Sequence, residues 1–169
     1  MAKLERRKNT RLPGVNYNEV GIICITICTK NRACLLSRLI ENEVEGDPVV
    51  ELLPHGKIAE KYIKQLDEFY DEISVENYVI MPNHIHMMLY VKVDKNGSEN
   101  VSIFTIQNSI VSKFLSTFKR FCNKEYGENI WQYRSHDHVI RNREDYEAHM
   151  KYIYENPSRW YYDELYKKE

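Results

Sequence analysis

The chain has 169 residues, of which 43% are hydrophobic and only 6 are Gly and 5 Pro, so residues 1–169 should form one globular domain with a sizeable core. No apolar run approaches the roughly 20 residues that span a bilayer, and the first residues lack the apolar segment of a signal peptide, so we expect a soluble, cytoplasmic protein with no membrane partner. The formal net charge of -1 gives no overall basic signal for a nucleic-acid partner.

Opposite charges are segregated along the chain. The first eleven residues contain a single acid, Glu5, among five cations: Lys3, Arg6, Arg7, Lys8 and Arg11. A later stretch gathers acids: Glu41, Glu43, Glu45, Asp47 and Glu51. Such segregation permits one basic surface, although a solvated tail explains the first cluster equally well.

The first predicted element is a strand from Val20 to Thr29, in which isoleucines alternate with Cys and Thr. A loop with the cations Lys30 and Arg32 follows it. The 4 cysteines of the chain form no Cys-x-x-Cys pair, which argues against a zinc ribbon or a thioredoxin-type site, and we expect them to be reduced.

The next stretch predicts a small hairpin and then a helix. Gly46-Asp47-Pro48 is a turn signal inside the acidic segment from Leu35 to Leu53. From Gly56 to Tyr70, apolar residues recur at helical spacing between charged ones, which predicts an amphipathic helix.

A β-hairpin with two histidines on one face is predicted from Asn77 to Val93. Pro82 and Asn83 suit the turn, and the two-residue period of the returning strand sends His84 and His86 to the same side. Imidazoles at i and i+2 of a strand can bind one cation. A polar strand face is the alternative interpretation of the same pair.

A polar stretch from Asp94 to Val101 predicts a loop, and the segment from Ile103 to Lys124 predicts a second helix. One side of this helix is apolar and rich in Phe, whereas the other carries only cations: Lys113, Lys119, Arg120 and Lys124. A purely cationic face suits contact with phosphates, although ordinary solubilisation would also explain it.

The chain should end in a short strand from His136 to Arg141 and a helix from Arg143 to about Asn156. Asn142 is well placed as its N-cap. Helical spacing predicts two stripes on this helix. One, the natural core side, comprises Tyr146, Met150, Ile153 and Pro157; the other is polar and comprises Asp145, His149, Tyr152 and Asn156.

Six blocks of the sequence resemble, in this order and spacing, the REP-associated tyrosine transposases of the HUH-type (His, hydrophobic, His) single-tyrosine superfamily with an IS200-like domain. The blocks are residues 25–32, 81–86, 118–121, 130–132, 137–142 and 152–157. The resemblance implies an α+β, ferredoxin-like antiparallel sheet of the β-α-β-β-α-β type, with helices on one face and a C-terminal helix that carries the nucleophile. Residues 1–18 would be a basic N-terminal segment and residues 158–169 a C-terminal tail, whose Tyr and charged residues indicate no particular chemistry.

The resemblance also implies a function. Such enzymes cut and join single-stranded DNA through a covalent 5′-phosphotyrosine and leave a free 3′-hydroxyl. By position, Tyr152 matches the nucleophile, whereas His84, His86 and Asn156 match metal ligands. These three ligands should therefore converge on one point, with the Tyr152 hydroxyl nearby.

Cofactor and partners follow from the same resemblance. Two nitrogens and one amide oxygen suit Mn²⁺ better than Mg²⁺, and the resemblance implies the use of either. The implied partner is single-stranded DNA with hairpins, bound by a monomer or a homodimer. The candidate DNA-binding residues are Arg6, Arg7, Arg11, Lys30, Arg32, Lys119 and Arg120.

Two alternative functions fit part of the pattern. A catalytically idle regulator with this fold could bind DNA or RNA hairpins through its basic face, but binding alone would need none of the residues matched to catalysis. A metal-dependent phosphoesterase that uses water would need the metal ligands and not the nucleophile Tyr152.

Overall fold

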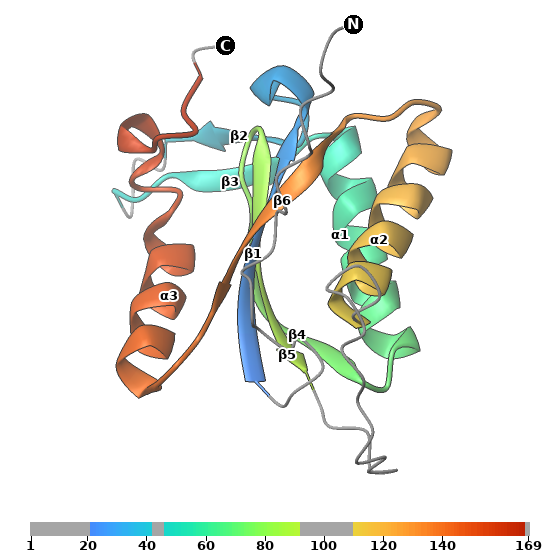
Figure 1. Cartoon of the computed structure of the whole chain (residues 1–169). Coiled ribbons are helices and arrows are strands. Elements are labelled where there is room, and N and C mark those ends of the chain that lie inside the picture. Colours follow the sequence, from blue (N-terminus) through green and yellow to red (C-terminus); the bar gives the residue numbers. More distant parts are fainter. Residues whose placement is uncertain (1–20, 42–45, 92–109, 168–169) are drawn as a thin grey trace, which may run out of the picture.

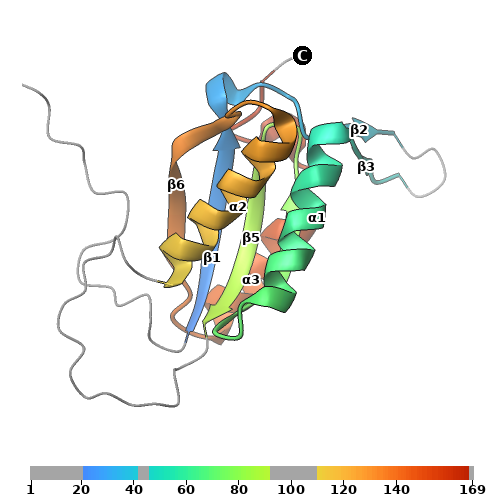
Figure 2. The ribbon, with the colours of Figure 1, turned by 90° about the vertical axis from the view of Figure 1, so that its right-hand side faces the viewer.

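The computed structural model describes residues 21–41, 46–91 and 110–167. Four antiparallel strands form its main sheet in the order β4-β5-β1-β6, with the bounds β1 Gly21–Thr29, β4 Ile73–Ile80, β5 His84–Val91 and β6 Trp131–Val139. Helices α1 (Pro54–Phe69) and α2 (Ile110–Tyr126) cover one face of this sheet, and α3 (Arg143–Glu155) covers the other (Figures 1 and 2). This arrangement confirms the predicted α+β, ferredoxin-like fold.

The core lies between the sheet and the pair α1 and α2. The two central strands contribute aliphatic side chains that are at most 3% exposed, and the two helices and the start of β6 contribute the other large members. The largest of these buried side chains are Ile25, Ile27, Ile85, Ile63, Leu66, Phe114, Phe118 and Trp131. Burial of this apolar layer supplies the main favourable free energy of folding.

The opposite face of the same strands is polar at one end. In the antiparallel register of β1 and β5, Cys28 lies opposite His84 and Thr26 lies opposite His86. Because side chains alternate along a strand, both histidines point away from the apolar core and toward the α3 side. The predicted hairpin and its division of residues between two faces are confirmed, but the first strand begins at Ile73 and not at Asn77, and residues after Val91 lie outside the described part of the chain.

Several other predicted elements are confirmed within one or two residues. The acidic hairpin is formed by β2 (Ser37–Ile40) and β3 (Val49–Leu52), which pair antiparallel. Asn142 caps α3, since its side-chain oxygen accepts a hydrogen bond from the Asp145 N–H at 2.8 Å. Two short 3-10 helices, η1 (Lys30–Arg32) and η3 (Trp160–Tyr162), complete the described elements.

The last strand differs from its prediction. The expected strand began at His136, whereas β6 begins at Trp131 and shifts its register against β1 between Ile27 and Thr29. The backbone N–H of Lys30 donates to the Ile130 carbonyl at 2.7 Å, and Ile130 and Trp131 are buried, so this end is held against β1. An irregular register interrupts simple alternation, which explains why the pattern suggested a shorter strand.

Helix α2 also continues beyond its predicted end at Lys124, through Glu125 to Tyr126. Glu125 therefore adds an acid to this helix, and it pairs with Lys61 of α1 at 2.7 Å. The predicted loop from Asp94 to Val101 and the predicted helical residues before Ile110 lie outside the described residues. None of the described helices has the length and apolar content that a membrane crossing requires.

The β2–β3 hairpin supports the turn that precedes His84. Leu36 N–H donates to the Pro82 carbonyl at 3.0 Å, and the Ser37 hydroxyl donates to the Ile80 carbonyl at 2.8 Å. The Leu36 carbonyl in turn accepts from Leu53 N–H at 2.9 Å, next to the start of α1. At Gly56 of α1 a Cβ atom would lie 1.9 Å from this carbonyl oxygen, so only glycine allows the helix to approach so closely.

We predict that Gly56→Ala destabilises the protein by about 1–3 kcal/mol, as overpacking does, despite the better helix propensity of Ala. The obstructing atom belongs to the backbone and cannot rotate away. Gly21→Ala is the matched control, because no atom lies within 4 Å of its Cβ position. Urea unfolding measures both free energies, and equal stability of the two variants would contradict the close packing at Gly56.

Candidate active site

Two buried imidazoles form the centre of the candidate site. The side chains of His84 and His86 come from the start of β5, where they are 0% and 8% exposed, and their ring centroids lie 4.6 Å apart. Their Nε2 atoms are buried and have no hydrogen-bond partner among the described residues. Unsatisfied buried nitrogens are costly, so their presence side by side suggests a ligand.

Hydrogen bonds at Nδ1 orient both rings. Asn83 donates from its amide nitrogen to the Leu165 carbonyl at 2.8 Å, which leaves its oxygen to accept from His84 Nδ1–H at 2.8 Å. His84 therefore carries its proton on Nδ1 and a lone pair on Nε2. The Thr26 hydroxyl lies 2.8 Å from Nδ1 of His86 and fixes that ring in the same way. Such hydrogen bonds to the far nitrogen are typical of histidines that bind metals.

Burial keeps both histidines neutral. It lowers the pKa of His84 to about 2, with a further lowering by His86 and an opposing contribution from the nearby Asn156 side chain. It lowers the pKa of His86 to about 4, and Asp163 opposes this shift. Neutral imidazole is the form that binds a cation, so the pair stays competent well below neutral pH.

Two oxygen-bearing side chains complete the cluster. Ligand atoms of His84, His86 and Asp163 all lie within 4.8 Å of one another. Asn156, the residue that ends α3, is 1% exposed, and its Oδ1 atom is a third buried atom without a partner among the described residues. Two imidazole nitrogens, a carboxylate and an amide oxygen suit a divalent cation, so the residues present fit the metal that the resemblance implies.

Asp163 was missed by the sequence interpretation, which assigned no chemistry to residues 158–169. The tail reaches the site because Trp160 is buried with its ring 5.8 Å from that of His84, and because Leu165 accepts from Asn83. The Asp163 carboxylate also accepts from Leu165 N–H at 2.7 Å. An aspartate in a tail of Tyr and charged residues has no spacing relation to the histidines, so the sequence offered no signal for it.

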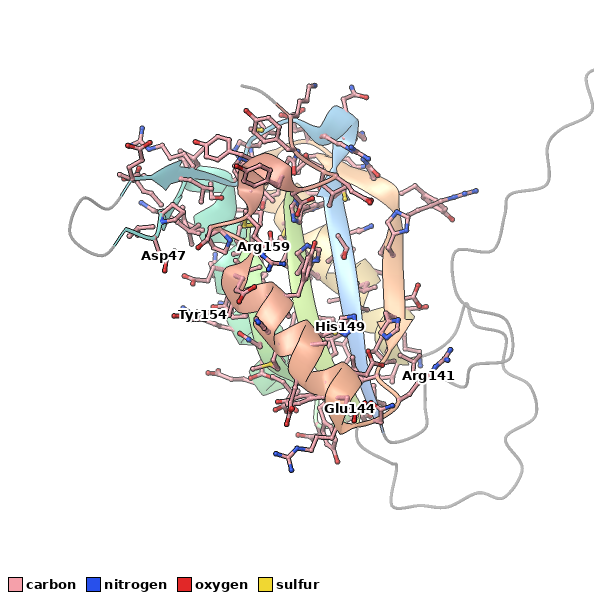
Figure 3. The ribbon with its side chains drawn as sticks, turned by 90° about the vertical axis from the view of Figure 1, so that its left-hand side faces the viewer. Asp47, Arg141, Glu144, His149, Tyr154 and Arg159 are labelled. Carbon is pink, nitrogen blue, oxygen red and sulfur yellow. The ribbon has the colours of Figure 1, made fainter. Side chains whose placement is uncertain are left out.

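Tyr152 lies beside this cluster. Its ring centroid is 5.0 Å from that of His86, and its hydroxyl donates to Asp163 Oδ2 at 3.3 Å. Burial and then the Asp163 charge raise the pKa of Tyr152. Tyr154, two residues later, is 82% exposed and lies on the other side of α3 (Figure 3). The structure therefore brings His84, His86, Asn156 and Tyr152 together, as the geometric prediction required.

The packing of α3 agrees with one predicted stripe and adds to it. Of the stripe expected to face the core, Ile153 is buried, Tyr146, Met150 and Pro157 are half-buried, and Asn77 of β4 donates to Met150 Sδ at 3.5 Å. The polar stripe also faces the sheet, through contacts such as Tyr152 with His86 and Asp145 with His138. Both stripes can pack on the sheet because its face toward α3 is polar at these positions of β5 and β6.

Comparisons with known proteins find distant relatives of the chain, although no family model matches it. An uncharacterized protein of Haemophilus influenzae is 27% identical over 98% of this chain and 96% of its own length. The REP-associated tyrosine transposase of Escherichia coli (strain K12) is 31% identical over 49% of this chain, and the match spans 43% of that protein. A putative REP-associated tyrosine transposase of H. influenzae is 31% identical over 52% of this chain and 51% of its own length.

A solved structure of a REP-associated tyrosine transposase bound to a REP hairpin covers 88% of this chain and 74% of its own, with a TM-score of 0.62 and 21% identity. At that identity the match shows a shared fold. The chain is a distant homologue of the REP-associated tyrosine transposases.

The predicted DNA-binding residues lie in three parts of the chain, one of which is outside the described residues. Lys30 and Arg32 follow β1 at the end that holds His84, since Thr29 N–H donates to the Asn83 carbonyl at 2.9 Å. Arg32 donates to the Glu164 carbonyl of the tail at 2.9 Å. The N-terminal candidates, Arg6, Arg7 and Arg11, lie outside the described residues.

Lys119 and Arg120 belong to α2, on the opposite face of the sheet from the histidines. Lys119 donates to the carbonyls of Gln132 and Tyr133 at 2.8 and 3.3 Å, so it helps to hold β6. The Arg120 guanidinium lies 5.3 Å from the centre of the Phe121 ring. Their role in DNA binding stays a prediction.

We predict that Thr26→Val weakens Mn²⁺ binding about 10–100-fold, because His86 loses the hydroxyl that orients its ring. Thr26→Ser keeps the hydroxyl and should retain the wild-type dissociation constant. Isothermal titration calorimetry measures both. Equal affinity of the Val and Ser variants would show that this hydrogen bond does not prepare the site.

The histidine pair should also make the metal-free protein sensitive to acid. Because the pKa values of His84 and His86 are lowered in the fold, the unfolded chain binds more protons than the folded chain below about pH 6.5. Stability therefore falls as the pH decreases, and the pair should account for a loss of about 2 kcal/mol between pH 6.5 and 5.5.

Urea unfolding with a chelator at both pH values measures this loss. Replacement of both histidines by Gln should remove about 2 kcal/mol of the pH dependence. His136→Gln, at an exposed position of β6, is the matched substitution outside the buried pair. An identical pH dependence of the double variant and the wild type would contradict neutral burial of the pair.

Proposed function

We propose that this chain is a metal-dependent single-stranded DNA endonuclease and strand transferase, that is, a transposase that forms a covalent 5′-phosphotyrosine at hairpin-forming DNA. The observation that carries the proposal is the position of Tyr152, whose hydroxyl lies beside the buried cluster of His84, His86 and Asp163. A phenol held next to a prepared cation site has the arrangement that nucleophilic attack on a phosphodiester needs.

The reaction follows from the groups present. Asp163 accepts the hydrogen bond of the Tyr152 hydroxyl and is in position to take its proton as the oxygen attacks phosphorus. A bond forms between the tyrosine oxygen and phosphorus, and the bond from phosphorus to the 3′-oxygen breaks, which leaves a 3′-hydroxyl once a proton is gained. The phosphotyrosine retains a phosphodiester linkage, so a 3′-hydroxyl can reverse the step and join strands without ATP.

The cation would be held by His84, His86, Asp163 and Asn156. Bound there, Mg²⁺ or Mn²⁺ would neutralise charge on the scissile phosphate, and the two nitrogen ligands favour Mn²⁺. The protein contributes rigidity, because Thr26 and Asn83 orient the imidazoles through their Nδ1 atoms. Trp160 packs close to His84 and shields that side of the cluster from water.

Substrate binding would use the basic residues near the same end. Lys30 and Arg32 follow β1 directly, at the end where His84 lies, and would contact the phosphates that flank the scissile bond. The N-terminal arginines Arg6, Arg7 and Arg11 would contribute further phosphate contacts, as would Lys119 and Arg120. The DNA hairpin would position the single-stranded segment next to it at the site.

We predict that Tyr152→Phe abolishes the protein–DNA adduct, with a loss of at least about 10³-fold in the rate of its formation. The probe is end-labelled single-stranded DNA that folds into a hairpin with randomised flanks, incubated with Mn²⁺ and resolved on a denaturing gel. Tyr154→Phe, on the exposed side of the same helix, is the matched control and should form the adduct at the wild-type rate.

The same gel distinguishes the alternatives. Retention of the DNA without cleavage would identify a hairpin-binding regulator, and cleavage without an adduct would identify a phosphoesterase that uses water. An adduct that persists in Tyr152→Phe would show that another residue is the nucleophile.

A further inference from the structure

A second group of potential metal ligands lies where β6 meets α3. It comprises His138 near the end of β6 and Asp145 and His149 in the first half of α3, and their ligand atoms all lie within 4.8 Å of one another. None of these residues belongs to the cluster around His84. His149 lies on the side of α3 that is turned toward β1 and β6 (Figure 3).

The donor atoms are already close to one another. His138 Nε2 lies 2.9 Å from Asp145 Oδ2, and His149 Nδ1 lies 3.1 Å from Asp145 Oδ1. Ligands about 2.0–2.1 Å from a tetrahedral Zn²⁺ are separated from each other by about 3.4 Å. A cation would therefore take the place of these direct contacts between each histidine and the carboxylate.

Backbone contacts hold the carboxylate in place. Asp145 Oδ2 accepts from Arg141 N–H at 3.0 Å, while the Asp145 N–H is bound by the Asn142 cap. The imidazoles of His138 and His149 stack with their centroids 4.4 Å apart and their planes at 15°, and His149 Nδ1 lies 2.9 Å from the Asp145 backbone carbonyl oxygen. Because nearly parallel rings cannot both direct an in-plane lone pair at one ion, a cation bound here would turn the His149 ring out of the stack and away from that carbonyl.

The cluster is also open to an incoming ion. The side chains of His138, Asp145 and His149 are 45%, 19% and 28% exposed, in contrast to the buried pair of His84 and His86. Two imidazole nitrogens and one carboxylate, with a fourth position left for water, form the donor set of many zinc sites.

We propose that His138, Asp145 and His149 form a second cation site, for Zn²⁺, that ties the start of α3 to β6. The site goes beyond the proposed nuclease, because none of its ligands takes part in the phosphoryl transfer. Its effect would be to fix the helix that carries Tyr152 against the sheet.

Zinc stoichiometry tests the proposal on the full, metal-free chain, by calorimetric titration with Zn²⁺ alone. The variant with His84→Gln and His86→Gln should still bind one ion, and a further His138→Ala and His149→Ala should abolish this binding or weaken it at least 100-fold. His136→Ala in the same background is the control, since His136 is exposed on β6 outside the cluster. Absence of zinc binding in the His84→Gln, His86→Gln variant would overturn the proposal.

Thermal unfolding gives a second readout. In the His84→Gln, His86→Gln background, Zn²⁺ at 100 times its dissociation constant should raise Tm by about 5–10 °C. Asp145→Asn keeps a hydrogen-bond acceptor but lacks the charge, so it should fold and lose this rise. A rise that persists in Asp145→Asn would contradict the site.

These outcomes are separate from those for the proposed function. If the cluster of His84, His86 and Asp163 does not bind metal, the proposed zinc site at His138 and His149 is unaffected. Loss of that site would in turn leave the adduct assay on Tyr152 able to succeed.

Discussion

The buried imidazole pair of His84 and His86 is the constraint on which the site depends. Each ring has one nitrogen satisfied inside the protein, by Asn83 or Thr26, and one buried nitrogen without a partner among the described residues. A polar atom that is buried without a partner lowers the stability of the fold by about 1–3 kcal/mol, so other interactions must supply this free energy. It does so on the other face of the same strands, where alternation places a continuous aliphatic layer against α1 and α2. Strand β5 thus contributes both to the core and to the candidate site.

Two segments are held close to this histidine pair by contacts near the start of β5. The turn before β5 is held by the β2–β3 hairpin through Leu36 and Ser37, while the tail after α3 is held by Asn83 and Arg32. Asn83 connects the turn to the tail, because its amide oxygen accepts a hydrogen bond from His84 and its amide nitrogen donates one to the Leu165 carbonyl. The position of Asp163 and the tautomer of His84 are therefore set by the same side chain.

The sequence predicted the fold well where a local pattern is typical of one kind of secondary structure. Period-two alternation placed both histidines on one face, and helical spacing placed Tyr152 and Asn156 on one polar stripe, since both periods are properties of the backbone alone. Asp163 could not be predicted, because its place depends on how the tail folds back over β5. The packing of α3 was predicted in part, since Ile153 is buried and Met150 contacts Asn77 of β4. The contacts of its polar stripe depend on polar side chains of β5 and β6, which the spacing along α3 alone does not show.

Helix α3, which carries the proposed nucleophile, is held largely by polar contacts. Among its residues only Ile153 is buried, so apolar packing alone fixes its position weakly. Polar contacts act at both ends: Asp145 binds His138 of β6 near the start, and Asn156 lies beside Asp163 and His84 at the end. Tyr152 lies between these two anchors. Its distance from the histidines therefore depends on groups that are candidate ligands for a cation, and a cation bound at either end would tighten the helix against the sheet.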